Sequence, residues 1–322
     1  MLTSRITGTL AVLTMAVPLA ACAGAPDGGG DAGGDGNTVR IAHNTNAANL
    51  PVRIADEQGF FEDEGIEVEF TAVENISTLP PALGRSFEIV QTAPTNMIAA
   101  SGQGIPMVAV CGATVDREQN PTAAVIGSQS AGITAIEDLE GKTLGVLNET
   151  GTLHTATKFW LQQADVPLDS VDIVQVDGPA MADQLSAGRV DAVETIEPFR
   201  SIALAEEDTV DLGDPYLQMA PEIGAVLWGA ERDWAEENAE TVEGFRSAIE
   251  AAIQFIQEDR ETAETVLQDY TGLSDEIIAQ TELPSYTSEL RPEDLGVWLE
   301  VMREVEDFSG DVELADLIPA EG

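Results

Sequence analysis

Residues 39–70, VRIAHNTNAANLPVRIADEQGFFEDEGIEVEF, carry the pattern of a strand, a helix and a second strand. Residues 39–42, VRIA, predict a short strand, and residues 66–70 alternate as a half-buried strand does. A helix is expected over residues 51–64, with proline in its first turn. The polar loop 44–50 follows the first strand. Ligands of open α/β sheets bind at such strand ends, so this loop is a candidate ligand site.

The same alternation continues along the chain. Strands are expected at residues 86–92 and 107–111, with a helix over 94–101 between them. Farther on, three strands alternate with three helices: strands at 143–147, 171–176 and 190–194, and helices at 152–164, 179–187 and 198–205. Such alternation predicts lobes of three layers, each with a mostly parallel sheet flanked by helices.

A short internal repeat links the two halves. Residues 84–94 and residues 188–198 both contain Gly-Arg, a six-residue strand ending in threonine, and a proline shortly after it. The repeat predicts that two lobes present the same strand, loop and helix to one shared cleft. Chance similarity between two short strands is the alternative.

The length of the chain favours two lobes over a single core. We expect the first lobe over residues 38–122, the second over 123–226, and a C-terminal helical part over 227–322 that packs on the first lobe. Crossings near 121–127 and 222–229 predict a two-stranded hinge. One helical stripe in the last part is expected to face the core; it consists of Val242, Phe245, Ile249, Ile253 and Ile256.

Two segments resemble a known family. Residues 55–68, ADEQGFFEDEGIEV, resemble the A-x-x-x-G-F-F-x-x-x-G-I/L-x-V signature of substrate-binding proteins of ABC importers for nitrate, sulfonates, taurine and thiamine precursors. Residues 136–146, IEDLEGKTLGV, resemble the phrase that opens the second lobe of many solute-binding proteins. The resemblance implies an α/β, two-lobe, periplasmic-binding-protein-like fold of type 2. Taken alone, Gly59 and Gly65 are equally explained as breakers at a helix-to-strand turn.

The N-terminal residues are typical of an exported lipoprotein. An apolar run over residues 10–21 is too short to span a bilayer and predicts a signal peptide over residues 1–21. Its ending, Leu-Ala-Ala-Cys, resembles a bacterial lipobox, which implies a lipid on Cys22; an ordinary cleavage site is the alternative. Residues 22–37 are rich in Gly and Asp and predict a flexible tether. We therefore expect a body held at the extracellular face of the membrane.

The net charge of −44 is strongly acidic, and Lys142 and Lys158 are the only lysines. This charge argues against nucleic acid as a partner. It favours a surface adapted to high salt, where screening weakens self-repulsion. Cys111 lies in an apolar run and is expected to be a buried strand residue, so that no intrachain disulfide forms.

No catalytic signature is found in the sequence. It contains no HExxH, no Cys/His metal spacing and no G-x-S-x-G, so we expect neither a metal nor a cofactor. Enzymes that make the thiamine pyrimidine are related to the family resembled here, but they carry a cysteine-rich cluster that this chain lacks. Binding is favoured over catalysis.

The candidate ligand residues follow the expected strand ends. Helices are expected to begin at Pro51, Pro94, Thr152 and Pro198, and their N-termini would favour an anionic group. Ligand contacts are expected from the residues at positions that match the family's motifs, together with Asn46, His154 and Trp228. The full set is Asn46, Asn49, Leu50, Pro51, Thr92, Ala93, Thr95, Gly151, Thr152, His154, Thr155, Glu194, Glu197 and Trp228.

Each of these residues also has a structural interpretation. The threonines are equally suited to cap helices, and the two asparagines to hold their loop. His43 and His154, the only histidines, both fall at expected cleft edges. An aromatic wall is expected from Phe159, Trp160, Phe199 and Trp228, of which the first two are also suited to a helix core.

Glu194 and Glu197 bear on the choice of ligand. A carboxylate repels a bound sulfonate unless the same molecule also brings an N–H donor. A zwitterion such as taurine, or a thiamine-type pyrimidine, satisfies this condition better than nitrate does. The alternative is that both carboxylates cap the helix at residue 198 or face solvent.

The expected function is that of a monomeric, lipid-anchored solute-binding protein. It would capture a small polar organic ligand, sulfonate-like or taurine-like, and deliver it by hinge closure to an ABC permease with its ATPase. A pyrimidine binder, a synthesis enzyme on the same fold and a sensory domain are the alternatives.

Overall fold

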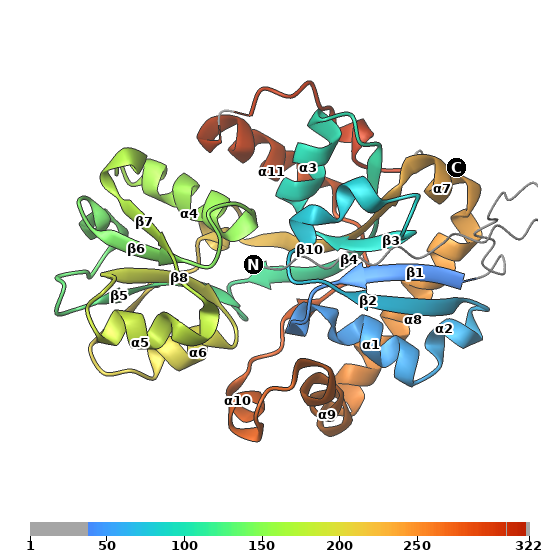
Figure 1. Cartoon of the computed structure of the whole chain (residues 1–322), viewed down its shortest axis with the longest axis horizontal. Coiled ribbons are helices and arrows are strands. Elements are labelled where there is room, and N and C mark those ends of the chain that lie inside the picture. The colour runs from blue at the N-terminus through green and yellow to red at the C-terminus, as the bar shows by residue number, and fades with distance from the viewer. Residues whose placement is uncertain (1–37, 307, 320–322) are drawn as a thin grey trace, which may run out of the picture. The chain divides into compact units, whose positions relative to one another are not determined.

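The computed structural model describes residues 38–306 and 308–319 (Figure 1). Residues 37–322 form one compact unit. The predicted signal peptide, Cys22 and the tether lie outside the described residues. The described fold lies in this unit and is built on two β-sheets. None of its helices is both long and apolar enough to cross a membrane.

The first sheet has six strands and the second has five. In order across the first sheet they are β11 (Ser285–Tyr286), β4 (Met107–Arg117), β10 (Glu222–Glu231), β3 (Ile89–Thr92), β1 (Thr38–His43) and β2 (Glu67–Ala72). Across the second sheet they are β7 (Asp172–Gln175), β6 (Thr143–Val146), β8 (Ala192–Ile196), β5 (Ala123–Ser128) and β9 (Thr209–Gly213).

Both sheets are mixed, whereas alternation along the chain predicted mostly parallel sheets. The pairs β1–β2, β1–β3, β6–β7 and β6–β8 are parallel, as predicted. The strands next to the crossings between the sheets pair antiparallel: β10 with β3 and β4, and β5 with β8 and β9. The difference arises because each sheet receives strands from chain segments that arrive from the other sheet.

The internal repeat is confirmed in the strand order. Without β11, the first sheet runs β4-β10-β3-β1-β2 and the second runs β9-β5-β8-β6-β7, with the same pattern of parallel and antiparallel pairs. Even side chains correspond. Glu88, before β3, accepts a hydrogen bond from the backbone N–H of Arg40, and Asp191, before β8, accepts one from that of Thr143. Strand β3, which follows Glu88, and strand β8, which follows Asp191, therefore occupy equivalent places in their sheets.

Helices cover both faces of both sheets (Figure 1). The first sheet lies between α1, α2, α8 and α9 on one face and α3 and α11 on the other; the second lies between α4 on one face and α5 and α6 on the other. The bounds are α1 (Leu50–Glu57), α2 (Phe60–Asp63), α3 (Pro94–Gly102), α4 (Thr152–Gln163), α5 (Met181–Ser186), α6 (Phe199–Leu204), α7 (Arg232–Glu237), α8 (Ala239–Glu258), α9 (Arg260–Thr271), α10 (Asp275–Gln280) and α11 (Pro292–Val305).

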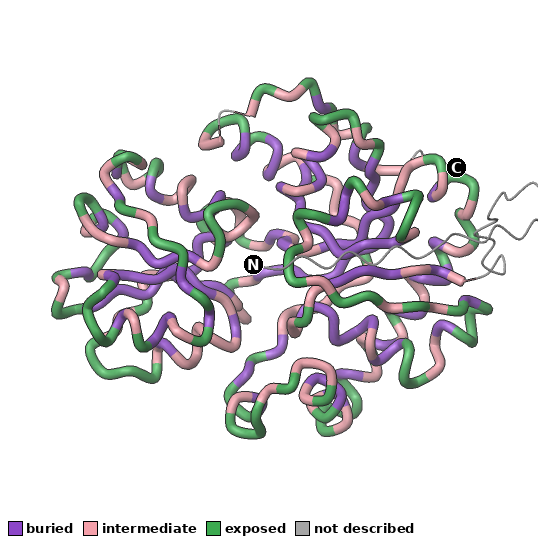
Figure 2. Tube along the Cα trace, in the orientation of Figure 1, coloured by how far each residue is buried: buried purple, intermediate pink, exposed green. Residues whose placement is uncertain are grey.

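The helix predicted over residues 51–64 is two helices, α1 and α2. Gly59 separates them with a φ of 78°, a left-handed conformation that glycine adopts at little cost. The C-terminal stripe is confirmed as core, since four of its five residues are buried against the first sheet and Ile253 is partly buried. Figure 2 shows buried stretches along the strands in the middle of both sheets.

The chain crosses between the sheets twice, at residues 118–122 and 214–221. The two crossings lie side by side, because Arg117 at the end of β4 pairs with Glu222 at the start of β10. The residues predicted to cross, 121–127 and 222–229, mostly belong to β5 and β10 instead. Strands of the second sheet therefore span Ala123 to Gly213, and the predicted boundaries at 122 and 226 remain a proposal.

Helix α11 forms a further connection between the sheets. It packs on α3 of the first sheet and on α4 of the second. Beyond its end, Glu306 accepts hydrogen bonds from Lys158 and Thr155 of α4, each at 3.0 Å. Glu304 accepts further bonds from two glutamines of the same helix, Gln162 and Gln163. This set of interactions is called here the α4–α11 contact.

Candidate functional site: a polar cleft between the two sheets

A cleft with a volume of about 200 Å³ lies between the two sheets. Residues from both sheets line it, and most of them follow strand ends or begin helices. The lining residues with polar side chains are Asn44, Asn46, Glu74, Asn75, Ser77, Gln91, Asn96, Asn148, Thr150, Thr152, His154, Glu194 and Tyr216. A water molecule has a share of about 30 Å³ in the liquid, so the cleft suits a compact ligand.

A smaller cavity of about 70 Å³ adjoins this cleft, and it shares Asn46, Ile196 and Tyr216 with it. The smaller cavity also contains Asp116 and Glu197. The starts of α3 and α4 line the larger space, while the turn before α1 and the residue before Pro198 line the smaller one. Of the four expected helix starts, those of α3 and α4 therefore line the larger space, whereas Pro51 and Pro198 line neither space themselves.

Asn49 organises the wall that belongs to the first sheet. Its Nδ2 lies within 3.1 Å of four oxygens: the backbone oxygen and Oδ1 of Asn44, Oδ1 of Asn46, and Oε1 of Gln91. The side chain of Asn49 is fully buried. It holds the loop after β1 against the end of β3, which is the loop role considered for it from sequence.

His154 and Glu194 form the centre of the opposite wall. The Nδ1 atom of His154, on the first turn of α4, lies 3.1 Å from each carboxylate oxygen of Glu194, on β8. Both side chains are buried. Gly151 precedes α4 with a φ of 105°, which favours glycine at this position. Thr152 beside it shares a hydrogen bond of 3.2 Å with the hydroxyl of Tyr216.

The cleft has no basic lining side chain among the described residues, apart from the imidazole of His154. In the His154–Glu194 pair the imidazole faces a carboxylate at 3.1 Å, so the pair adds no net positive charge while that carboxylate is ionised. Glu74 adds an exposed negative charge. The N-termini of α3 and α4 supply partial positive charge. The cleft therefore offers hydrogen-bond donors and dipoles to an anionic group, together with a carboxylate for an N–H donor.

Buried carboxyl groups are concentrated near the crossings. Burial raises the pKa of Asp116 to about 6 and that of Asp214 to about 7. Asp116 accepts hydrogen bonds from the backbone N–H and hydroxyl of Thr122, while Asp214 accepts one from the N–H of Ala123. Both carboxyls thus bind the first crossing segment, although Asp214 belongs to the second.

Burial also shifts other groups around the cleft. It raises the pKa of Glu197, against the opposing effect of hydrogen bonds from Ser201 and Arg200. It raises the pKa of Tyr216 well above its ordinary value and lowers the pKa of His43. Tyr216 is therefore a neutral hydrogen-bonding group at physiological pH.

Six of the residues expected to contact ligand line the larger cleft: Asn46, Ala93, Gly151, Thr152, His154 and Glu194. Glu197 lines the smaller cavity, where Ser201 and Arg200 bind its carboxylate. It therefore stabilises the first turn of α6, which is the capping role considered for it. His43 lies on β1 and does not line either space.

Seven expected residues line neither space: Asn49, Leu50, Pro51, Thr92, Thr95, Thr155 and Trp228. Leu50 and Trp228 belong to the core under the first sheet, and Trp228 packs edge-on against Phe245. Their side chains point into the core rather than into the cleft, because they lie on the buried faces of α1 and β10. The Thr155 hydroxyl is held by Glu306 in the α4–α11 contact.

Several lining residues were missed from sequence, above all Gln91 and Tyr216. Gln91 stands at the position of the internal repeat that corresponds to Glu194, so the repeat itself was a usable signal. Tyr216 lies in the second crossing, where no periodic pattern marks it. The exposed or partly exposed carboxamides of Asn75, Asn96 and Asn148 likewise carry no spacing signal.

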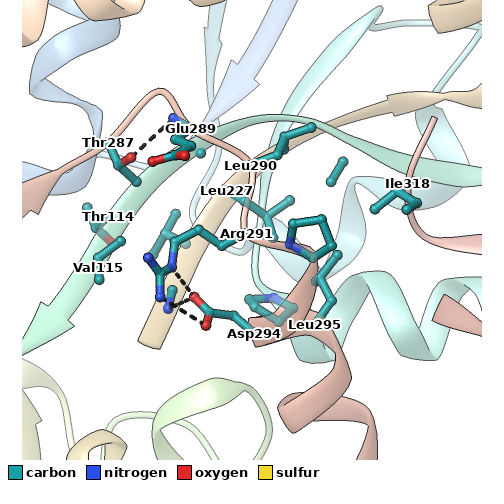
Figure 3. A pocket seen from close by; sticks show the side chains of 16 residues that line it. Thr114, Val115, Leu227, Thr287, Glu289, Leu290, Arg291, Asp294, Leu295 and Ile318 are labelled. Carbon is teal, nitrogen blue, oxygen red and sulfur yellow. Dashed lines mark hydrogen bonds and ion pairs between the residues drawn. The ribbon is translucent and has the colours of Figure 1, made fainter. Parts of the chain in front are cut away.

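Behind the cleft, a cavity of about 30 Å³ lies between β4, β10 and the start of α11 (Figure 3). It is about the size of one water molecule. Arg291 bonds to Asp294 at 2.5 Å and to Glu222 at 2.7 Å, while Asp294 accepts a bond from the backbone N–H of Gly224 at 2.6 Å. These ion pairs attach the start of α11 to β10, the strand that follows the second crossing.

Comparison with known proteins places this fold and cleft in a family. The NMT1/THI5-like family model matches residues 46–263, which include most of both sheets and both walls of the cleft. The chain belongs to the NMT1/THI5-like family. No group of three or more His, Cys, Asp or Glu side chains in the described part of the chain is arranged to hold a metal ion.

Two relatives of this chain are named for different activities, one for synthesis and one for import. The chain is 24% identical over 238 residues to 4-amino-5-hydroxymethyl-2-methylpyrimidine phosphate synthase of Candida albicans, covering 68% of this chain and 67% of the synthase. It is 22% identical over 262 residues to the nitrate import ATP-binding protein NrtC of Synechocystis, covering 73% of this chain but only 38% of NrtC.

The fold matches a solved binding protein. The periplasmic aliphatic sulphonate binding protein SsuA of Escherichia coli superposes with a TM-score of 0.74 at 17% identity, covering 88% of this chain and 97% of SsuA. The likeness shows the predicted fold, that of periplasmic binding proteins, with two α/β lobes. At this identity it does not extend to the ligand.

Proposed function

We propose that the protein is the solute-binding component of an ABC importer. The observation that carries the proposal is the polar cleft, whose two walls come from equivalent strand ends of two sheets joined by adjacent crossings. A ligand that bridges the walls stabilises the closed arrangement by its higher affinity for it. The closed form then delivers the ligand to a permease that works with its ATPase.

The ligand proposed is a small polar organic molecule of the sulfonate or taurine type. The helix N-termini favour its anionic group, and Glu194 favours an N–H donor elsewhere in the same molecule. Nitrate satisfies only the first condition. A thiamine-type pyrimidine has no anionic group, but its ring nitrogens are neutral acceptors for the N–H groups at the helix N-termini and its amino group is a donor for Glu194, so it is the second candidate ligand.

Binding is tested most simply by thermal unfolding of the purified protein in high salt. The panel contains nitrate, ethanesulfonate, taurine, 2-methylpyrimidine and 4-amino-2-methylpyrimidine. A ligand present at about 100 times its Kd stabilises the folded state by about 2.7 kcal/mol. We expect a clear rise in unfolding temperature with a compound that has an amino group. If no compound in the panel raises the unfolding temperature, the result would count against solute capture.

A lipid on Cys22 and a location at the extracellular face of the membrane form part of the proposal. They rest on the Leu-Ala-Ala-Cys sequence before the tether. Metabolic labelling with a fatty acid tests them: label should enter the full chain and be lost in Cys22→Ser. A labelled Cys22→Ser variant, or a wild-type chain released into the medium without label, would contradict the anchor.

Synthesis of a thiamine pyrimidine is the candidate function from another class. The name of the Candida albicans relative supports it, and the alignment covers most of this chain. In the described residues, His154 is the only histidine that lines the cleft, and it is paired with Glu194. An incubation that yields a pyrimidine phosphate would favour the enzyme, whereas transport in cells that is lost with the permease genes would favour import.

A further inference from the structure

Gln91 is a buried residue that lines the cleft. It lies on β3 and is 1% exposed. Its Oε1 accepts hydrogen bonds from the backbone N–H of Asn44 at 2.9 Å and from Nδ2 of Asn49 at 3.1 Å. Within residues 38–306 and 308–319, its Nε2 has no hydrogen-bond partner. The side chain is thus held through its oxygen, while its two N–H donors are unused.

The orientation of this amide is determined by its neighbours. A backbone N–H can only donate, so the atom of Gln91 that faces Asn44 must be the oxygen. Turning the amide over would place its NH₂ group against two donors, the N–H of Asn44 and the NH₂ of Asn49. A buried donor without a partner destabilises the folded state, because it has lost its hydrogen bonds to water. An acceptor atom of a ligand in the cleft would remove that destabilisation.

The opposite wall has the complementary chemistry. Glu194 occupies the position of the internal repeat that corresponds to Gln91, and its carboxylate can only accept hydrogen bonds while it is ionised. One bond comes from His154, which leaves acceptor capacity on both oxygens. Equivalent positions in the two sheets thus present a donor on one wall and an acceptor on the other.

We infer that Gln91 is a specificity-determining residue, which binds an acceptor group of the ligand while an N–H donor of the same ligand faces Glu194. The ligand class is a compact molecule with an acceptor at one end and an amine or amino group at the other. Asn49 is a positioning residue, because it acts on the ligand only through Gln91. The inference rests on the proposed function of solute capture.

Gln91→Glu tests the inference by replacing the donor with an acceptor of the same shape. The retained oxygen keeps its bonds from Asn44 and Asn49. Titration calorimetry compares taurine with ethylenediamine, in which an amine replaces the sulfonate. We expect the wild-type protein to bind taurine at least 10-fold more tightly than ethylenediamine, and Gln91→Glu to reverse that order. 4-Amino-2-methylpyrimidine, which also has both groups, is expected to lose at least 10-fold in affinity.

Asn96→Asp is the matched control, because it adds the same charge to the same wall of the cleft, on α3. It should weaken taurine less than Gln91→Glu does and should not reverse the preference. Equal effects of the two variants would mean that charge alone acts, and would overturn the role of Gln91. Unchanged taurine binding in Gln91→Glu, or loss of taurine with no gain for ethylenediamine, would also overturn it.

The same titrations separate this inference from the proposed function. Binding of ethanesulfonate or nitrate by the wild-type protein, with neither taurine nor the aminopyrimidine bound, would refute the ligand class and leave solute capture standing. Failure of every compound to bind, together with uptake that does not depend on this protein in cells, would refute both.

Discussion

At the scale of single residues, we propose that Glu194 decides which end of a ligand can lie against the second sheet. Its buried carboxylate receives a bond from His154 and is the only fully buried acidic group that lines the larger cleft among the described residues. A ligand donor there makes a charge-assisted hydrogen bond, which is stronger than a neutral one.

Glu194→Gln should weaken an amine-bearing ligand such as taurine by about 1 to 3 kcal/mol. The loss follows because a neutral amide replaces the carboxylate that faces the amine. Calorimetric titration measures it. Glu74→Gln removes a charge from an exposed lining residue and should change the affinity by less than about 0.5 kcal/mol. Equal affinity in Glu194→Gln and wild type would place the side chain outside the site.

Cys111 provides a test of the core. It is fully buried on β4, its sulfur lies 3.4 Å from the backbone oxygen of Ser288, and burial raises its pKa above the ordinary range. A thiol that stays protonated reacts slowly. A Cys22→Ser chain should therefore react with a thiol reagent only after denaturation. Rapid labelling of the native protein would show that β4 is not buried as described.

At this scale the sequence predicted some residues better than others. Gly151 and His154 follow the end of β6, and Glu194 lies near the end of β8, so position along the chain indicates that they reach the cleft. Trp228 lies within β10 and Leu50 begins α1, and both side chains pack in the core, because which side of a strand or helix faces a neighbouring layer depends on tertiary structure. Thr155 could not be predicted, since its partner Glu306 lies far away in sequence.

At the scale of elements, the α4–α11 contact adds a connection that hinge strands alone do not provide. Lys158 Nζ lies 3.0 Å from Glu306, and Ala156 of α4 belongs to the same apolar cluster as Trp298 of α11. The edge of Trp298 also meets the ring of Tyr216, which lines the cleft. The contact therefore favours the arrangement of the sheets in which the cleft is formed.

Lys158→Met should weaken ligand binding by about 0.5 to 1 kcal/mol, the usual contribution of a partly exposed ion pair. The effect should shrink in 1 M salt because salt screens the pair. Lys142→Met is the matched control: Lys142 is the only other lysine, and it bonds to Ala131 within the second lobe. Equal losses in the two variants would contradict a role for the α4–α11 contact.

Most elements could be predicted from periodicity, and the exceptions have physical causes. The break between α1 and α2 depends on the left-handed conformation of Gly59, which a helical pattern does not reveal. Strands β9 and β11 were missed because β9 is only half buried and β11 has two residues. The antiparallel pairs could not be predicted, since they depend on where the crossings bring β5 and β10.

At the scale of the whole molecule, the buried carboxyls at the crossings couple the fold to pH. The pKa of Asp116 and of Asp214 rises on folding, from an ordinary 3.8 to about 6 and about 7. Between these values the folded state binds more protons than the unfolded state does. The free energy of unfolding contributed by the pair therefore falls as pH rises from about 4 to about 7, and is constant above that range.

Asp214→Asn should accordingly gain stability relative to the wild type as pH rises from 5 to 8, by about 1 to 3 kcal/mol. The amide oxygen can still accept the bond from the N–H of Tyr216, which lies 2.8 Å from Asp214. Urea unfolding at both pH values measures the difference. Asp116→Asn combined with Asp214→Asn should remove this pH dependence. A stability difference that is the same at pH 5 and pH 8 would contradict it.

The charge of −44 acts on the molecule as a whole. Like charges repel across the surface, and the Debye length falls from about 10 Å at 0.1 M to about 3 Å at 1 M salt. The unfolding midpoint should therefore rise with potassium chloride and should rise much less with an uncharged osmolyte of equal osmolality. Equal stability at low and high salt would contradict a surface adapted to salt.

We propose that a ligand with both an acceptor and an N–H donor draws the two walls of the cleft together. Spin labels at the exposed positions Glu69 on β2 and Asp172 on β7, one in each sheet, measure their separation in a Cys22→Ser chain. Taurine or 4-amino-2-methylpyrimidine should convert a broad distribution of distances into one narrow distribution, and ethanesulfonate should not. An unchanged distribution at saturating concentration of a compound that binds would contradict the claim.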